Sequence, residues 1–260
     1  MEKVIDMHNV SWRRQGNEIL HDINWEVKKQ EHWTVLGLNG AGKTTLLNMV
    51  NGYIWPTTGE VSVLGNKFGQ TDITKLRYSI GWVSSSLSER INSHHKTEEL
   101  VVSGKFAAVG LTFADPTEAD FARAREIMKQ LNVEHTYGQP YAKCSHGEKQ
   151  KILIARGLIA NPKLLILDEP TSGLDFISRE ELLRAVEQLT VKQDAPTIIF
   201  VTHHIEEVLP VFSHTLLLKD GTVFAKGERE NVLTSENMSK LYGRKIQVDW
   251  RKDRAWMALV

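Results

Sequence analysis

Residues 37–44 read GLNGAGKT, a stretch whose residue types and spacing suit the binding of a phosphate chain. They fit the pattern G-x-x-x-x-G-K-[ST], and they lie between an apolar run that predicts a strand and a run that predicts a helix. Glycines let backbone N–H groups curl around phosphates, and the helix N-terminus adds a partial positive charge. The residues of this phosphate loop that we expect to contact a nucleotide are Gly37, Asn39, Gly40, Ala41, Gly42, Lys43, Thr44 and Thr45.

Charged and polar side chains in the loop and after a later strand suit the binding of Mg²⁺ and the hydrolysis of a bound nucleotide. Lys43 would reach the β- and γ-phosphates, and Thr44 would ligate Mg²⁺ through its hydroxyl. Asp168 and Glu169 end the apolar run at residues 164–167, at the edge where ligands of open α/β sheets gather. Asp168 can hold Mg²⁺, and Glu169 is placed to polarise an attacking water as a general base. The alternative is that both acids only end a strand.

The segment CSHGEKQ, residues 144–150, admits two interpretations. Cys144 and His146 are soft metal ligands, but no second cysteine pair or spaced histidine pair completes a tetrahedral zinc site. Ser145 and Glu148 have the spacing of a capping box, and a strongly helical run follows them. We therefore expect a helix N-terminus here, which could also bind an anion.

These residues need a scaffold that brings strand ends and helix starts together. The first 60 residues predict short strands with turns, and strands then alternate with helices, which favours an α/β fold with a mostly parallel sheet and an antiparallel β subdomain. The continuous apolar runs 164–167 and 198–201 are typical of parallel strands buried on both faces. Asp220 and Gly221 predict a hairpin turn.

The segment from about residue 91 to residue 143 has a different pattern, with two predicted helices at 96–111 and 117–131. We interpret it as part of an inserted helical subdomain. The predicted organisation is a nucleotide-binding core at residues 1–85 and 155–230, a helical subdomain at 86–154 and a C-terminal extension at 231–260.

The composition limits the partners and the compartment. Acidic and basic residues balance at 32 each, so no overall field attracts nucleic acid, and we expect no direct nucleic-acid partner. The single cysteine excludes an intrachain disulfide. We find no signal peptide and no apolar run of about 18 residues. We therefore expect a cytoplasmic protein that reaches the inner face of the membrane only through a partner.

Five motifs in this order resemble the nucleotide-binding subunit of ABC-type ATPases over about residues 3–230: the phosphate loop, CSHGEKQ, LLILDEP, SGLD and VTHH. The resemblance implies a P-loop NTPase fold and a head-to-tail dimer with a second copy or a homologous ATPase chain. Two ATP molecules would lie between the chains. Ser145 and Gly147 would contact the γ-phosphate of ATP held by the partner chain, and Asp175 belongs to the loop that couples the two sites. His203 would contact the γ-phosphate and act with Glu169.

The chain departs from the ABC pattern at three places. The family signature reads Leu-Ser-Gly-Gly-Gln, whereas Cys144, His146 and Glu148 replace three of its residues here. Ser85 stands where a glutamine usually touches Mg²⁺ and couples to a membrane partner, so we include it among the metal residues. The aromatic residue that stacks on adenine falls near Arg14, and either the guanidinium of Arg14 or the indole of Trp12 could serve.

The resemblance implies an Mg²⁺-dependent ATP hydrolase that powers a separate transmembrane permease as the ATP-binding subunit of an ABC transporter. The C-terminal tail resembles that of some metal-chelate importer ATPases, and the chain resembles metal-chelate and molybdate importer ATPases to some degree. Two alternatives stay open. The first is a soluble ABC ATPase that acts on DNA, ribosomes or regulation without a channel. The second is a nucleotide-sensing module without turnover, which the presence of Glu169 and His203 disfavours.

Overall fold

The computed structural model describes residues 2–84, 91, 94–106, 111, 115–191 and 194–260. Ser85 lies outside these residues, so its metal role stays a prediction. The chain forms two compact units, and each is described by itself. The first unit comprises Met1–Arg77 and Thr197–Val260, and the second comprises Tyr78–Pro196. Within the described residues, no helix is both long and apolar enough to cross a lipid bilayer.

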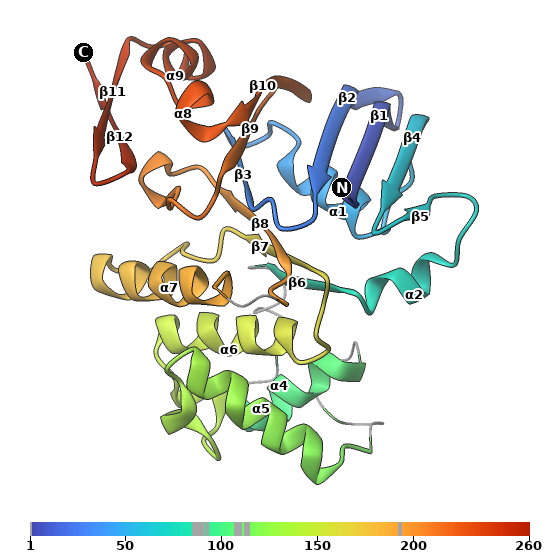
Figure 1. The fold of residues 1–260 in the computed structure, drawn as a ribbon, viewed down its shortest axis with the longest axis vertical. Helices are drawn as coiled ribbons and strands as arrows, with labels where there is room; N and C mark the ends of the chain where they lie inside the picture. The colour runs from blue at the N-terminus through green and yellow to red at the C-terminus, as the bar shows by residue number, and fades with distance from the viewer. Residues whose placement is uncertain (1, 85–90, 92–93, 107–110, 112–114, 192–193) are drawn as a thin grey trace. The chain divides into compact units, whose positions relative to one another are not determined.

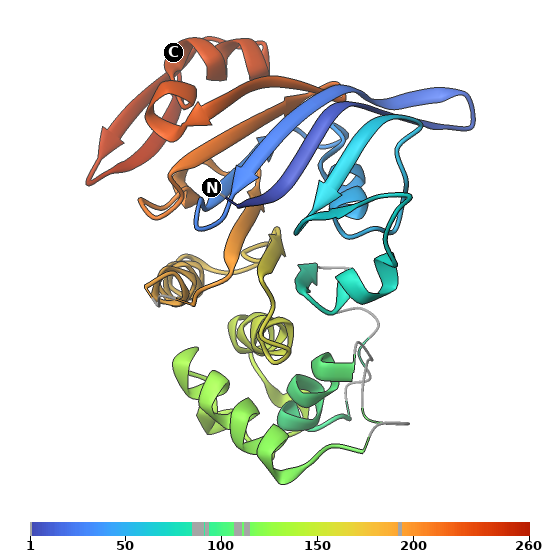
Figure 2. The ribbon, with the colours of Figure 1, turned by 45° about the vertical axis from the view of Figure 1, so that its right-hand side comes forward.

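The first unit contains an antiparallel sheet built from the N-terminal strands (Figures 1 and 2). Its strand order is β2-β1-β4-β5, and the strands are β1 (Lys3–Arg14), β2 (Asn17–Lys28), β4 (Thr58–Val63) and β5 (Asn66–Lys67). Every second residue along β2 from Ile23 to Val27 is fully buried, as expected for a sheet with one face in the core. The short helix α2 (Ile73–Arg77) ends this part of the chain.

A second set of strands in the first unit carries the phosphate loop. Strand β3 (Trp33–Gly37) pairs in parallel with both β8 (Thr197–Thr202) and β9 (His214–Lys219). All residues of β3 and β8 are buried, which explains their continuous apolar sequence. Helix α1 (Lys43–Val50) follows β3 and contacts β2 and β3.

The hairpin predicted at Asp220 and Gly221 is present. Strand β9 is antiparallel to β10 (Thr222–Glu228). Asp220 has a φ angle of 47° and Gly221 a φ angle of 73°, the left-handed values that a two-residue type I′ turn requires. The predicted turn is therefore confirmed.

The last segment of the chain also belongs to the first unit. Helices α8 (Arg229–Val232) and α9 (Ser235–Tyr242) lead into a hairpin of β11 (Ile246–Arg251) and β12 (Arg254–Leu259). The hairpin contacts the short 3₁₀ helix η4 (Ile205–Glu207), because the Arg254 side chain donates a hydrogen bond of 2.9 Å from Nε to the Glu206 carbonyl. This segment therefore braces the chain just after β8.

The second unit is built around one helix (Figure 1). Nine of the 13 residues of α6 (His146–Leu158) are buried, because α6 packs against α7 on one side and against α4 and α5 on the other. The surrounding elements are β6 (Ile80–Ser84), α4 (Thr97–Ser103), η1 (Gly104–Phe106), α5 (Glu118–Gln130), η2 (Glu134–Thr136), η3 (Tyr141–Lys143), β7 (Leu164–Asp168) and α7 (Phe176–Leu189). Strands β6 and β7 pair in parallel. The predicted α/β class, with parallel strands, an antiparallel sheet and a helical part, is confirmed.

Two glycines allow the backbone of α6 to approach its neighbours closely. A Cβ atom on Gly81 of β6 would collide with the carbonyl oxygen of Gly157. A Cβ atom on Gly104 of η1 would collide with the carbonyl oxygen of Arg156. The backbone at residues 156–157 is therefore enclosed from two directions by positions that only glycine can occupy.

Candidate nucleotide-binding site

The phosphate loop joins β3 to α1 in the first unit. Gly40 has a φ angle of 82° and Gly42 a φ angle of 100°, in the region that glycine adopts without a steric penalty. A Cβ atom on Gly42 would also lie 2.9 Å from Leu20 Cδ2. Gly42 is the N-cap of α1 and supplies no side-chain cap, so the first N–H groups of this helix are suited to an external anion.

Lys43 is the buried cation of this loop. Its side chain is only 7% exposed, and Nζ donates hydrogen bonds to the carbonyl oxygens of Gly37 at 2.8 Å and Leu38 at 3.2 Å. The amine is thus held along the loop. The next residue, Thr44, is exposed on the first turn of α1, while Ala41 is buried.

The β9–β10 turn contacts the phosphate loop through backbone hydrogen bonds. The backbone N–H of Gly221 donates to the carbonyl of Ala41 at 3.1 Å, and the N–H of His21 donates to the carbonyl of Gly221 at 2.8 Å. The sequence predicted the turn but not this contact, because nothing in a local pattern indicates which loop a hairpin touches. The turn therefore supports the loop through its backbone, in addition to the hydrogen bonds of the Lys43 side chain.

His203 lies at the same edge of the sheet as the phosphate loop. Leu36 of β3 is in parallel register with Thr202 of β8. Gly37, the last residue of β3, and His203, the first residue after β8, therefore lie at the carboxyl ends of adjacent strands. The hydroxyl of Tyr242 donates to the carbonyl of His203 at 3.2 Å, and the imidazole of His203 lies 4.1 Å from that of His204 between ring centroids. The loop and His203 therefore follow the ends of adjacent strands, and their joint contact with a phosphate stays a prediction.

Trp12 and Arg14 lie near the end of β1. Trp12 is half-buried and pairs with Leu20, the residue that packs against Gly42, while Arg14 is exposed. The pairing shifts register between Trp12 and Arg13. Both residues are thus carried by the strand pair that borders the phosphate loop, and their contact with adenine stays a prediction.

The acidic pair ends β7 in the second unit. Asp168 is in parallel register with Ser84, the last residue of β6, so both strands end at the same edge. Glu169 has a φ angle of 51°, a left-handed conformation that is uncommon for residues other than glycine and is concentrated at functional sites. Its carbonyl accepts a hydrogen bond of 3.1 Å from the N–H of Ser172. The chain therefore turns sharply directly after the two carboxylates.

Segment 144–150 is a capped helix start, as predicted. The Oγ atom of Ser145 accepts from the Glu148 N–H at 3.3 Å, and Glu148 Oε2 accepts from the Ser145 N–H at 2.7 Å. Cys144 is buried, and burial raises the pKa of its thiol. Among the residues that the structure describes, no group of three metal-ligating side chains forms. The capping-box interpretation is confirmed, and Ser145 is exposed at the helix start.

Within the second unit, residues 144–148, here called the signature segment, contact the SGLD loop, residues 172–175. The His146 ring nitrogen Nε2 lies 3.2 Å from the carbonyl oxygen of Ser172. A Cβ atom on Gly147 would lie 3.3 Å from Ser178 Cβ, so the glycine lets the start of α6 approach the first turn of α7. Asp175 caps α7 by accepting from the Ser178 N–H at 3.0 Å and hydroxyl at 2.8 Å, and these bonds lower the pKa of its carboxyl. The sequence presented His146 as a candidate metal ligand and as a departure from the ABC pattern, and neither interpretation indicated this contact.

The chain matches the family model described as ABC transporter over residues 20–172. It is 44% identical over 255 residues to the ABC transporter ATP-binding protein YlmA of Bacillus subtilis, covering 98% of this chain and 96% of YlmA. It is 32% identical over 243 residues to the molybdate import ATP-binding protein MolC of Haemophilus influenzae, covering 93% and 89% of the two chains.

Two solved structures are similar to the whole fold. A metal-chelate type ABC transporter in an inward-facing conformation has a TM-score of 0.80 and 30% identity, with 100% of this chain and 97% of that chain covered. The dimeric ATP-binding cassette MJ0796, in a post-hydrolysis state bound to ADP and Pi, has a TM-score of 0.72 and 27% identity, with 86% and 98% covered. The span of the family model, residues 20–172, includes the phosphate loop, residues 144–150 and the acidic pair.

Proposed function

The chain belongs to the ABC transporter family of ATP-binding proteins, and from this premise we propose that it hydrolyses Mg-ATP in a head-to-tail dimer that powers a separate membrane-spanning partner. The observation that carries the proposal is the register of Leu36 with Thr202. It sets the phosphate loop and His203 on adjacent strand ends, where one phosphate group can be bound from both sides.

The nucleotide role of the first unit follows from its loop. The N–H groups of residues 40 and 42–44 and the amine of Lys43 would bind the phosphates of ATP, because these donors lie at the start of a helix without a side-chain cap. The Ala41 N–H donates to the carbonyl of Leu38 at 3.1 Å within the loop. Trp12 or Arg14 would stack on the adenine. His203 would donate to the γ-phosphate as charge develops there during hydrolysis.

The donor set fits Mg²⁺, which prefers hard oxygen ligands. The exposed hydroxyl of Thr44 and the carboxylate of Asp168 would hold it, and Ser85 is a further ligand in our prediction. Bound there, Mg²⁺ would neutralise charge on the β- and γ-phosphates. Glu169 would accept a proton from the attacking water as general base, and its sharply turned backbone would fix the direction of the carboxylate.

The proposed dimer is supported by the exposure of Ser145. The chain has one phosphate loop and one signature segment, and Ser145 with Gly147 would contact ATP held by the second chain. Asp175 would lie at the same junction, since His146 joins the signature segment to the SGLD loop. The similarity to the dimeric cassette MJ0796 supports a dimer.

A membrane-spanning permease is the proposed partner, and the inner face of the membrane is the proposed location. The similarity to a metal-chelate type transporter and to a molybdate import protein supports a metal-chelate or oxyanion importer. A soluble ABC ATPase is the second possibility. It is less well supported, because the similarity to the molybdate import protein MolC covers 93% of this chain and 89% of MolC.

Two measurements test the proposal. ATP turnover by the purified chain should require Mg²⁺ and should disappear in Lys43→Ala. Mild cross-linking in cells that express the tagged chain at its native level should recover it from the membrane fraction with one multi-span protein. Recovery only from the soluble fraction would contradict the transport role, whereas absence of turnover would contradict the enzymatic role.

A further inference from the structure

The signature segment carries a negative charge close to where a phosphate should bind. Glu148 lies one helical turn after Ser145, and its side chain is 27% exposed. An isolated carboxylate at this position would repel the γ-phosphate that Ser145 is proposed to contact, since like charges at a helix start disfavour each other across several ångströms. The chain must therefore compensate for this charge if it uses Ser145 on ATP.

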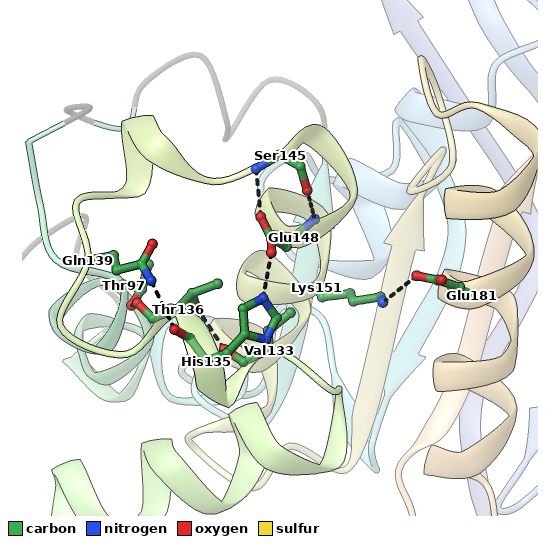
Figure 3. Close-up of polar contacts among 9 residues, drawn as sticks. All are labelled: Thr97, Val133, His135, Thr136, Gln139, Ser145, Glu148, Lys151 and Glu181. Atoms are coloured by element: carbon green, nitrogen blue, oxygen red, sulfur yellow. Dashed lines mark hydrogen bonds and ion pairs between the residues drawn. The ribbon is translucent and has the colours of Figure 1, made fainter.

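A histidine from a different part of the second unit lies on this carboxylate. Nε2 of His135, in η2, is 2.6 Å from Glu148 Oε1 (Figure 3). With the carboxylate ionised, the ring nitrogen must be the donor. The other oxygen, Oε2, accepts from the Ser145 N–H at 2.7 Å. The two oxygens of Glu148 thus link His135 directly to the N-cap. This link lowers the pKa of the Glu148 carboxyl, with the His135 hydrogen bond as the largest cause.

The backbone around His135 is anchored in the interior of the second unit (Figure 3). The buried hydroxyl of Thr97 donates to the carbonyl of Thr136 at 2.8 Å, and the hydroxyl of Thr136 donates to the carbonyl of Val133 at 2.8 Å. The amide of Gln139 donates to the carbonyl of His135 itself at 3.0 Å. The backbone of the turn that carries His135 is therefore fixed, so only the side-chain torsions of His135 need to be ordered for the ring to meet Glu148.

We propose that His135 is a positioning residue for ATP: it holds Glu148 in the capping box and offsets its charge, so that Ser145 can face the γ-phosphate of ATP bound by a second copy. This inference rests on the proposed function. A neutral imidazole donates an N–H to the carboxylate, and a protonated one also supplies a positive charge.

An ordinary surface pair provides a matched control. Nε2 of His8 lies 2.8 Å from Asp6 Oδ1 in β1, and the His8 side chain is 59% exposed compared with 61% for His135. Exposed pairs of this kind contribute little to stability. The His8 pair joins residues of one strand and does not involve the capping box. It should therefore have no role in ATP use.

The test is the KM for ATP in Mg²⁺-saturated ATPase assays of the full-length chain. His135→Ala should raise the KM about fivefold at low ionic strength. The rise should be smaller in 0.5 M salt, because the Debye length falls to about 4 Å there and charges are screened more strongly. Glu148→Gln keeps a residue that fits the capping box and removes the charge. In that background His135→Ala should change the KM by less than about 1.5-fold. His8→Ala should leave it unchanged.

The outcomes separate the two proposals. A wild-type chain without ATP turnover would overturn the proposed function. If the wild type shows turnover, two results would overturn the role of His135 alone. In the first, His135→Ala leaves the KM unchanged. In the second, His135→Ala raises the KM by the same factor with and without Glu148→Gln. If His135→Ala lowers the unfolding temperature markedly, His135→Gln decides, since its amide can still donate but carries no charge. It should raise the KM about twofold at low salt, and no rise would count against the inference.

Discussion

Nζ of Lys43 lies 2.8 Å from the carbonyl oxygen of Gly37, the residue with which the phosphate loop begins. The side chain that we propose as the main phosphate ligand is therefore also the residue that ties the two ends of its own loop together. Replacement of Lys43 should therefore remove a phosphate ligand and also a hydrogen bond within the loop.

Lys43→Ala should lower the affinity for ATP about 100-fold, because charge-assisted hydrogen bonds contribute about 1.5–3 kcal/mol each. Isothermal titration calorimetry measures the change. Lys226 is a matched control, since its amine also donates to a backbone carbonyl, that of Asn24 at 2.5 Å. Lys226→Ala should bind ATP normally, and equal losses in both variants would contradict the role of Lys43.

Glu169→Gln should retain ATP binding and lose turnover by about 10²–10⁴-fold, the usual contribution of a general base. Because the nucleotide then persists, the protein should accumulate as an ATP-loaded dimer. Size-exclusion chromatography with light scattering in saturating Mg-ATP measures this state. A variant that stays monomeric under these conditions would count heavily against the proposed dimer.

Removal of Mg²⁺ with EDTA should reduce ATP turnover at least about 100-fold, because neutralisation of phosphate charge contributes several kcal/mol to the transition state. Turnover should return when MgCl₂ is added in excess. Asp168→Asn should raise the Mg²⁺ concentration needed for half-maximal turnover. Turnover that is indifferent to EDTA would exclude the metal role of Thr44 and Asp168.

Gly81→Ala should destabilise the second unit by about 1–3 kcal/mol, because the new Cβ atom meets the backbone carbonyl of Gly157 and cannot be relieved by a rotamer change. Urea unfolding followed by circular dichroism measures the loss. Gly157→Ala is the control: its Cβ atom would come nearest to side-chain atoms, Val83 Cγ2 at 3.2 Å and Leu165 Cδ1 at 3.4 Å, with the nearest backbone atom, Gly81 Cα, at 4.0 Å. The control should lose less stability, since alanine also favours the helix.

Acid should weaken the capping box of α6. The pKa of Glu148 in the folded chain lies below its ordinary value of 4.5, so its contribution to stability is fully present above pH 4.5 and is lost as the pH falls through the folded-state pKa. Glu148→Gln lacks this titration. The free energy of unfolding of the wild type, measured relative to Glu148→Gln, should therefore decrease between pH 7 and pH 3.5. A difference that is constant with pH would refute the ionised cap.

Local patterns in the sequence were sufficient to predict the phosphate loop, the Asp220–Gly221 turn and the capping box at Ser145, because each depends on residues within a few positions of one another. The contacts of His146 with Ser172 and of His135 with Glu148 could not be predicted. They join residues 26 and 13 positions apart, and their formation depends on how helices pack. The choice between Trp12 and Arg14 also stays open, since a register shift separates them.

The enclosure of α6 at residues 156–157 has a mechanical consequence. Where backbone meets backbone through glycine, there is no side chain that can rotate to absorb a push. A movement of Ser145 would then displace the whole of α6, and with it β6 and η1, with little local deformation of the contacts between them. We therefore expect α6 to move as a rigid body, held near residues 156–157 by its close contacts with Gly81 and Gly104.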